Sequence, residues 1–334
     1  MKSDGGRIKK GNFDYNSLDF STSNVSNGSE NKLQYNTFGQ LISRARLEKK
    51  PLVVVEGKDD VPIYEQFAKK VNKKVRICAI ETFSNYSEGC THVKRFIEDA
   101  QVEINKSEEN EKFIMGIVDR DASYYRDEIN EMKCLLVLKA YSFESHFVTR
   151  KNLEYAVENY LSSNFGINEF IIDYIFKEYE SSINLFYYYS LEALKNACSK
   201  HYKGIIGYSK SYGQIIRETD LPNKIMAKKE ELDQYALAMR VPSDNPISII
   251  KGKWLLDLFI DKTHESLLAL SEFCSTDSVI DGQERCSFCQ SGNANKCSWK
   301  PKKGFIPTIY RGFILQFFNE IEVDYIYERF KSLG

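Results

Sequence analysis

The stretch that most constrains this chain is Leu52–Asp60, which has the sequence LVVVEGKDD. Four apolar residues lead directly into Glu56 and a glycine, a pattern typical of a buried parallel strand that ends at a turn. A second run of this kind, Phe113–Asp121, has the sequence FIMGIVDRD and ends in Asp119 and Asp121. Ligands of open α/β sheets bind at the carboxyl ends of the strands, so we expect the three carboxylates to share one crevice. Carboxylates placed this way repel one another strongly unless a cation joins them.

Residues 37–150 alternate between strand and helix patterns. Strands are expected at 52–55, 74–80, 113–118 and 134–138. Helices are expected at 37–48, 61–71 and 91–104, followed by a helix or turn at 123–132. Such alternation with short loops predicts an α/β fold, a Rossmann-like parallel sheet with right-handed crossovers and helices on both faces.

The pattern changes after about residue 150, where strand signals fade and apolar residues recur at helical spacing. Helices are expected at 152–163, 167–178, 185–202, 225–239, 254–273 and 309–331. Residues 1–36 are rich in Ser, Asn and Gly and cannot bury a core, so we expect a flexible arm. The chain is therefore divided into this arm, an α/β domain at 37–150, and a mostly helical domain at 151–334 with a cysteine-rich loop at 274–300.

Composition limits what the chain can do. Of its 334 residues, 42% are hydrophobic, which is enough for a sizeable core. The net charge of −1 gives no overall attraction to nucleic acid, so any such binding has to use local basic patches. No apolar run reaches the length of a membrane span, and we expect a cytoplasmic protein that does not bind membranes. Eight cysteines are too few for a disulfide scaffold.

The order and setting of the acids resemble those of the TOPRIM domain, which has a glutamate after one strand and an Asp-x-Asp pair after a later one. Glu56 in VVVEGKDD and Asp119 and Asp121 in IVDRD match this layout, and the resemblance covers about residues 50–150. VEGKDD, VDRD and the segment YSFESHF at 141–147 together resemble a group of TOPRIM nucleases from bacterial anti-phage systems. This is the OLD-like and PARIS-type defence group.

The resemblance implies a function and partners. It implies a metal-dependent endonuclease that cleaves RNA, tRNA included, or DNA as the toxic effector of a two-component defence system. It also implies an ABC-class ATPase that holds the effector inactive until infection, and a homodimer as the active form. The Tyr-Ser-x-Glu segment matched at 141–144 implies that Glu144 faces the crevice. Ala122 and Ser123 stand where TOPRIM primases and topoisomerases usually have a glycine, which favours the nuclease branch.

The acids themselves suit phosphodiester cleavage, because Mg²⁺ and Mn²⁺ prefer oxygen ligands and lower the pKa of bound water. We assign Asp119 and Asp121 as metal ligands, and Glu56 as a ligand or the general base. Glu144 is assigned to a second ion, and Lys58 is suited to neutralising charge on the phosphate. The alternative is that these acids are helix caps and solvated loop charges. The chain would then be a non-catalytic adaptor that binds a nucleotide or a partner.

Three of the cysteines cluster in a polar loop as Cys286-x2-Cys289-x7-Cys297. Zn²⁺ takes four tetrahedral ligands, and Cys274 is the natural fourth, with His264 as a longer-range candidate. A loop that lacks apolar residues gains order from a metal. Structural zinc is the favoured interpretation, and free thiols or a redox-active group are the alternatives.

Several lysines are candidates for contacts with nucleic acid. A helix opens at residues 89–91, where its N-terminus can hold a phosphate, and Lys94 follows. Basic residues interleave with aromatics in 195–212 and in 286–319, where Trp299 lies among lysines, and this pattern suits phosphate contact and base stacking. The alternative is that the lysines are solvated or bind an acidic protein, and that the aromatics form core. The candidate lysines are Lys94, Lys251, Lys253, Lys300, Lys302 and Lys303.

Overall fold

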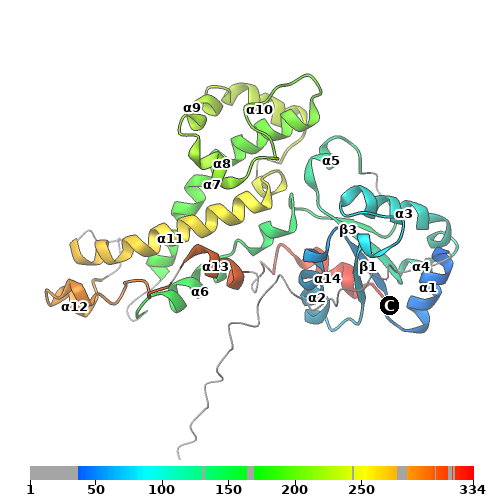
Figure 1. Ribbon diagram of the computed structural model, residues 1–334, viewed down its shortest axis with the longest axis horizontal. Helices are drawn as coiled ribbons and strands as arrows, with labels where there is room; N and C mark the ends of the chain where they lie inside the picture. Colours follow the sequence, from blue (N-terminus) through cyan, green and yellow to red (C-terminus); the bar gives the residue numbers. More distant parts are fainter. Residues whose placement is uncertain are drawn as a thin grey trace, which may run out of the picture.

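The structure is a computed structural model that describes most of the chain. The described residues are 37–129, 132–163, 169–242, 244–276, 284–304, 306–314, 318 and 320–334. The arm expected at 1–36 lies outside them. Within these ranges, an α/β body sits at one end of an elongated helical body (Figure 1). None of the described helices combines the length and the apolar surface that crossing a bilayer requires.

The α/β body is built on a four-stranded, all-parallel sheet, as predicted. Its strands are β1 (Leu52–Val55), β2 (Arg76–Ala79), β3 (Ile114–Val118) and β4 (Leu135–Val137). Their order across the sheet is β2–β1–β3–β4, and β1 pairs with β2 on one side and with β3 on the other. The chain therefore changes its direction of winding between β1 and β3, and ligands of open α/β sheets bind at such a switch point.

Helices cover both faces of the sheet. Helices α1 (Phe38–Leu47) and α3 (Cys90–Ile104) pack on one face, and α2 (Val61–Lys70) packs on the other. The side chains of β1 alternate between these two cores and are all buried, which explains its unbroken apolar run. Gly116 in β3 lets α3 lie close to the strand, because a Cβ atom there would stand 2.7 Å from Cγ1 of Ile97.

The helical body is organised around two long helices that pack against each other, α7 (Glu169–Cys198) and α11 (Gly252–Thr276). Figure 1 shows α11 running from beside the α/β body to the far end of the molecule, where α12 lies. The shorter helices of this body are α6 (Arg150–Tyr160), α8 (Tyr212–Arg217), α9 (Leu221–Met226), α10 (Lys229–Ala238), α12 (Ser287–Gln290) and α13 (Pro307–Ile314). The α/β body contains two further short helices, α4 (Glu108–Glu111) and α5 (Asp121–Tyr125).

Several predicted helices have different bounds in the structure. The helices expected at 167–178 and 185–202 form one helix, α7, because no glycine or proline interrupts it. The helix expected at 225–239 is divided between α9 and α10. The one expected at 309–331 is also divided, and its second part, α14 (Asp324–Lys331), begins at an acid, which suits a helix N-terminus.

The C-terminal segment returns to the α/β body. The ring centroids of Phe318 and Tyr327 lie 4.3 and 5.5 Å from that of Phe67 in α2. The backbone N–H of Gly334 donates to the carbonyl of Lys112 at 2.9 Å, just before β3. The end of the chain, which the sequence division groups with the helical domain, therefore packs against the region around the sheet.

Candidate functional site

Two of the predicted acids meet at the switch point of the sheet. Glu56 directly follows β1, and Asp119 directly follows β3. The backbone N–H of Asp119 donates to Oε1 of Glu56 at 2.7 Å, although the two residues are 63 positions apart in sequence. Neighbouring parallel strands end at the same edge of the sheet, so the fold itself brings the two acids into contact.

Burial and like charges oppose the ionisation of both carboxyl groups. Burial raises the pKa of Glu56 to about 7, and the charges of Asp60 and Asp121 add to the effect. The backbone N–H groups of Asp119 and Cys90 act in the other direction, because they donate to the Glu56 carboxylate. Burial and then the charge of Glu56 raise the pKa of Asp119 well above its ordinary value. A cation bound among these groups would relieve the repulsion and release protons.

Glu144 reaches the same group of acids from the 3₁₀ turn η4 (Phe143–Phe147). Its side chain is buried, and its charge adds to burial in raising the pKa values of Asp119 and Asp60. Oε2 of Glu144 accepts a hydrogen bond from Oγ of Ser142 at 2.5 Å. Glu144 is therefore close to the acids at the strand ends, although it lies on a separate element.

Helix α11 begins directly against this turn. The backbone N–H of Gly252 donates to Oγ of Ser142 at 3.2 Å, and Ser142 in turn donates to Glu144. A Cβ atom on residue 252 would lie 2.4 Å from Oγ of Ser142 and 2.9 Å from Oε2 of Glu144, closer than real Cβ atoms approach. The absence of a side chain at 252 therefore allows the first turn of α11 to support Glu144.

Asp121 is partly committed to local structure. It has a φ of 23° and begins the short helix α5. Its Oδ1 accepts from the backbone N–H of Ser123 at 2.6 Å and from Oγ of Ser123 at 2.5 Å. These are local contacts within the first turn of α5, close to the structural role that the alternative interpretation gives the acids. Asp121 also acts on Glu56. Burial is the main cause of the raised pKa of Glu56, and the charge of Asp121 adds to it.

Asp60 belongs to the same group of acids, although the sequence pattern did not predict it there. Burial raises the pKa of Asp60 to about 6, and the charge of Glu144 adds to this. Its Oδ2 accepts from the backbone N–H of Gly57 at 3.0 Å, within the turn that follows β1. One feature of the sequence could have identified Asp60. It lies four residues after Glu56, so a tight turn after the strand brings its side chain back towards the strand end.

Lys58 is exposed in the 3₁₀ turn η2 (Lys58–Asp60) and lines a cavity of about 410 Å³ beside the ends of β1 and β2. The other residues of the lining are Asp59, Glu81, Tyr86, Ser87 and Glu88. Three acids against one lysine make this cavity attractive to cations rather than to free anions. Lys58 stands next to the group of acids, and its contact with a phosphate stays a prediction.

The N-terminus of α3 holds Glu56 rather than an open phosphate site. The backbone N–H of Gly89 donates to the Glu56 carbonyl at 3.0 Å, and that of Cys90 donates to the Glu56 carboxylate. Burial raises the pKa of Cys90 to about 12, so this thiol is not a nucleophile at neutral pH. Nζ of Lys94 donates to the carbonyl of Glu128 at 2.7 Å. These contacts count against the phosphate site predicted around the start of this helix.

The other predicted lysines fall into two groups at opposite ends of α11. Lys251 and Lys253 lie at its start, and Nζ of Lys251 donates to the carbonyl of Tyr208 at 2.7 Å. Burial lowers the pKa of Lys251, and the neighbouring charge of Lys253 lowers it further. The second group lies in the exposed segment after the last cysteine and consists of Lys300, Lys302 and Lys303.

The aromatic residues of the basic segments are largely core. Trp299 is only 3% exposed, Tyr212 is buried as well, and Tyr208 is half-buried against the same core. Their rings pack in the same core as α7 and α11. Of the two interpretations of Trp299, the core one is therefore confirmed, because tertiary packing places its indole inside.

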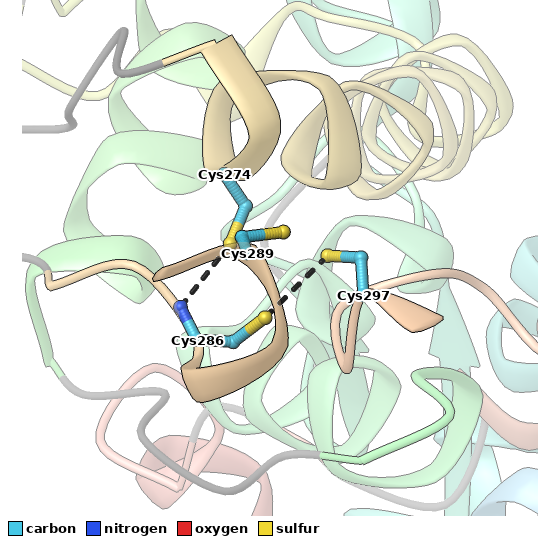
Figure 2. A group of neighbouring side chains, drawn as sticks. All are labelled: Cys274, Cys286, Cys289 and Cys297. Carbon is cyan, nitrogen blue, oxygen red and sulfur yellow. Dashed lines mark hydrogen bonds between the residues drawn. The ribbon is translucent and has the colours of Figure 1, made fainter. Parts of the chain in front are cut away.

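Four cysteines come together as predicted, and Figure 2 shows them converging from three segments. Cys274 lies in the last turn of α11, Cys286 caps α12, Cys289 lies within α12, and Cys297 lies in the loop that follows. All four are buried, and their sulfur atoms all lie within 4.8 Å of one another. This group could hold a metal such as zinc, and His264 is not part of it.

The surroundings of the cluster favour a thiolate at Cys286, whereas burial raises the pKa of Cys274 and raises that of Cys297 to about 11. The backbone N–H of Cys286 donates to Sγ of Cys274 at 3.2 Å, and Sγ of Cys286 lies 3.9 Å from Sγ of Cys297, too far for a disulfide (Figure 2). Burial alone would raise the pKa of Cys286, but the N–H groups of Ser298 and Cys289 lower it to about 6. The thiolate is the form that binds a metal.

The two candidate sites are far apart. Helix α11 has 25 residues, so its axis spans about 37 Å between the turn beside Glu144 and the turn that carries Cys274. A metal held by the cysteines is therefore too distant to act at the carboxylates. No protein-family model matches this chain, and no curated protein matches it either. What each site does has to be argued from its own residues.

Proposed function

We propose that this chain is a metal-dependent nuclease of the TOPRIM type, in which the acids at the switch point hold Mg²⁺ or Mn²⁺. The observation that carries the proposal is the direct contact between Asp119 and Glu56 at the ends of two adjacent parallel strands. Burial raises the pKa of Asp119, and the charges of Glu144 and Asp121 add to the effect, so these acids share one electrostatic site. Oxygen ligands of this kind suit hard divalent cations.

In this proposal each side chain has its own task. Asp119 and Asp121 are metal ligands, and Glu56 is a ligand or the general base. A divalent ion bound there supplies an acidified water and neutralises charge on the phosphate. Without a cation, burial raises the pKa of Glu56 to about 7; a bound divalent ion would lower it and leave the carboxylate that a ligand or a general base needs. Glu144 serves a second ion, and Lys58 balances the charge of the phosphate.

The sequence motifs support a biological role for this nuclease. VEGKDD, VDRD and YSFESHF resemble the anti-phage group of TOPRIM nucleases. We therefore extend the proposal to a toxic effector of a two-component defence system that an ABC-class ATPase controls and that acts as a homodimer. Its substrate is RNA, tRNA included, or DNA.

The cysteine cluster is proposed to bind a structural Zn²⁺. Four thiolates complete a tetrahedral shell and leave no position open for a substrate. Elemental analysis of the purified chain should therefore find one equivalent of zinc, and Cys289→Ser should lose it. A chain without metal, whose four thiols all react readily with a thiol reagent, would instead favour the interpretation as free cysteines.

Cleavage of total cellular RNA and of plasmid DNA tests the nuclease. The wild type is incubated with Mg²⁺ or Mn²⁺ beside Glu56→Ala and Asp119→Ala. Glu65→Ala is the matched control, because Glu65 is an exposed acid of α2 and is not a proposed ligand. We expect discrete fragments from the wild type and the control, and a loss of roughly 100-fold or more in the other two variants.

A non-catalytic adaptor is the alternative, and one observation favours it. Among the residues that the structure describes, the cysteines form a metal-binding group of closely gathered ligand atoms and the carboxylates do not. In an adaptor, the acids would hold a structural ion or the metal of a bound nucleotide. Toxicity or immunity that survives Glu56→Ala would favour the adaptor, as would a wild type that is not toxic even when freed from its partner.

A further inference from the structure

Phe288 is an exposed aromatic residue held between two of the clustered cysteines. It lies in α12 between Cys286 and Cys289 and is 42% exposed, whereas both cysteines are buried. The carbonyl of Phe288 accepts from the backbone N–H of Asn293 at 2.8 Å, which closes the turn behind it. A single exposed aromatic needs no explanation by itself, so the charge around it decides whether it has a function.

Residues 284–304, which we call the knuckle, are strongly basic. They contain one acidic residue, Glu284, and five basic ones, which are Arg285, Lys296, Lys300, Lys302 and Lys303. The formal charge of the knuckle is therefore +4, in a chain whose net charge is −1. Arg285 is used internally, because it donates to the carbonyls of Cys274 and Cys289. The exposed positive charge comes from the four lysines, and two of them, Lys300 and Lys302, also donate to the carbonyls of Asn295 at 3.1 Å and Asn159 at 2.6 Å.

The knuckle is fixed in place before any ligand binds. Helix α12 packs against the 3₁₀ turn η6 (Ala294–Lys296), and the cysteine cluster ties both to the end of α11. On the other side, Leu161 forms an antiparallel bridge with Pro301, and the backbone N–H of Ser162 donates to the carbonyl of Lys300 at 2.8 Å. A platform held in this way loses little conformational entropy on binding.

We infer that the knuckle binds single-stranded nucleic acid, with a base stacked on Phe288 and phosphates beside the lysines. An aromatic face combined with flanking positive charge is the usual surface for single strands, because every base has a π-face and every link carries a charge. Trp299 cannot stack on a base, because its side chain is buried. What the knuckle would do for the protein rests on the proposed nuclease, since it would hold a strand at the end of α11 opposite the carboxylates, and that helix is about 37 Å long. Binding is nevertheless measurable without cleavage.

Fluorescence anisotropy with the full chain in magnesium-free buffer tests the stacking contact. The probes are a labelled single-stranded RNA, a single-stranded DNA of the same sequence, and the corresponding duplexes. Phe288→Ala should weaken single-strand binding by about tenfold or more. Phe170→Ala is the matched control, because Phe170 is 52% exposed on α7 and should bind as the wild type does. Zinc content equal to that of the wild type shows that the variant knuckle is intact.

The salt dependence of binding tests the lysines. Lys296→Gln combined with Lys303→Gln should reduce the slope of log affinity against log salt by about 1.4, which is about 0.7 for each lost phosphate contact on a single strand. Lys177→Gln combined with Lys200→Gln removes two exposed lysines of the helical body outside the knuckle and should leave the slope unchanged.

The inference is overturned if the wild type does not bind single strands, or if Phe288→Ala binds them as tightly as Phe170→Ala. Lysine variants that weaken binding while Phe288→Ala does not would indicate phosphate contacts without base stacking and would also overturn it. Binding through the knuckle by a chain that cleaves nothing would support the inference and count against the nuclease. Cleavage by a chain whose single-strand binding does not depend on Phe288 would support the nuclease and overturn the inference.

Discussion

Glu56 carries its carboxyl group into a crevice that already holds Asp60, Asp119 and Asp121. Burial is the main reason that its pKa rises from an ordinary 4.5 to about 7, and the neighbouring charges add to it. A raised pKa means that the folded protein binds this proton more tightly than the unfolded chain does. Glu56 therefore contributes stability that is complete below about pH 4.5 and is lost as the pH rises towards about 7.

Without Mg²⁺, the wild type should become less stable from about pH 5 to about pH 8, with Glu56 contributing on the order of 3 kcal/mol. Glu56→Gln removes this titration, so its melting temperature should fall less with pH and should exceed that of the wild type at about pH 8. Scanning fluorimetry in magnesium-free buffer measures both curves. Glu65→Gln, which changes an exposed glutamate of α2, should follow the wild type. Equal pH dependence in Glu56→Gln and the wild type would contradict the role given to burial.

The positions of single residues could be predicted where a short sequence motif determines them. The contact between Glu56 and Asp119 could be predicted, because apolar runs mark strand ends and parallel strands align those ends. The cysteine set could be predicted because a tetrahedral site needs four ligands at short spacing. Whether Trp299 is core or a stacking surface stayed open, and Asp60 was not expected among the acids, because both depend on packing between distant segments.

The same limit applies to helices α7 and α11. Apolar periodicity identified both, but it did not show that α7 is continuous, because a polar stretch can as easily lie on an exposed helix face as in a loop. Nor could it place the start of α11 at Gly252, since glycine is a poor helix former. That start is set by the contact with Ser142, which belongs to a distant part of the chain.

Alanine at 252 should be harmful, although alanine normally favours a helix over glycine. The added Cβ atom would meet Oγ of Ser142 and Oε2 of Glu144, both on buried side chains with little room to move. We expect Gly252→Ala to lower the free energy of unfolding by about 1–3 kcal/mol, as overpacking does. Urea denaturation measures the change.

Gly213→Ala is the control for this prediction. Gly213 lies in α8, and an added Cβ atom there would have no heavy atom within 4 Å apart from the local backbone. This variant should therefore gain about 0.5–1 kcal/mol in the free energy of unfolding. Opposite signs for the two substitutions would show that Gly252 is kept for the close approach of α11, and stabilisation by both would rule that out.

At the scale of the whole molecule, α11 joins two sites of different chemistry. Oxygen ligands lie beside its first turn and sulfur ligands at its last, and hard and soft metals distinguish between such sets. The return of the C-terminal segment to α2 adds a second connection, so the two bodies share one continuous core. The molecule is thus connected mechanically along its length, while its two candidate metal sites remain electrostatically separate.

Removal of the zinc site should therefore weaken the fold without abolishing the effect of Mg²⁺. We expect Cys289→Ser to lose zinc and to melt roughly 5 °C or more below the wild type, because metal binding contributes directly to folding. Mg²⁺ should still raise its melting temperature, since the carboxylates lie about 37 Å away along α11. Cys198→Ser, which changes a cysteine outside the cluster, should keep both zinc and the response to Mg²⁺. If Cys289→Ser no longer responds to Mg²⁺, α11 transmits the state of one site to the other, and the two sites form one coupled unit.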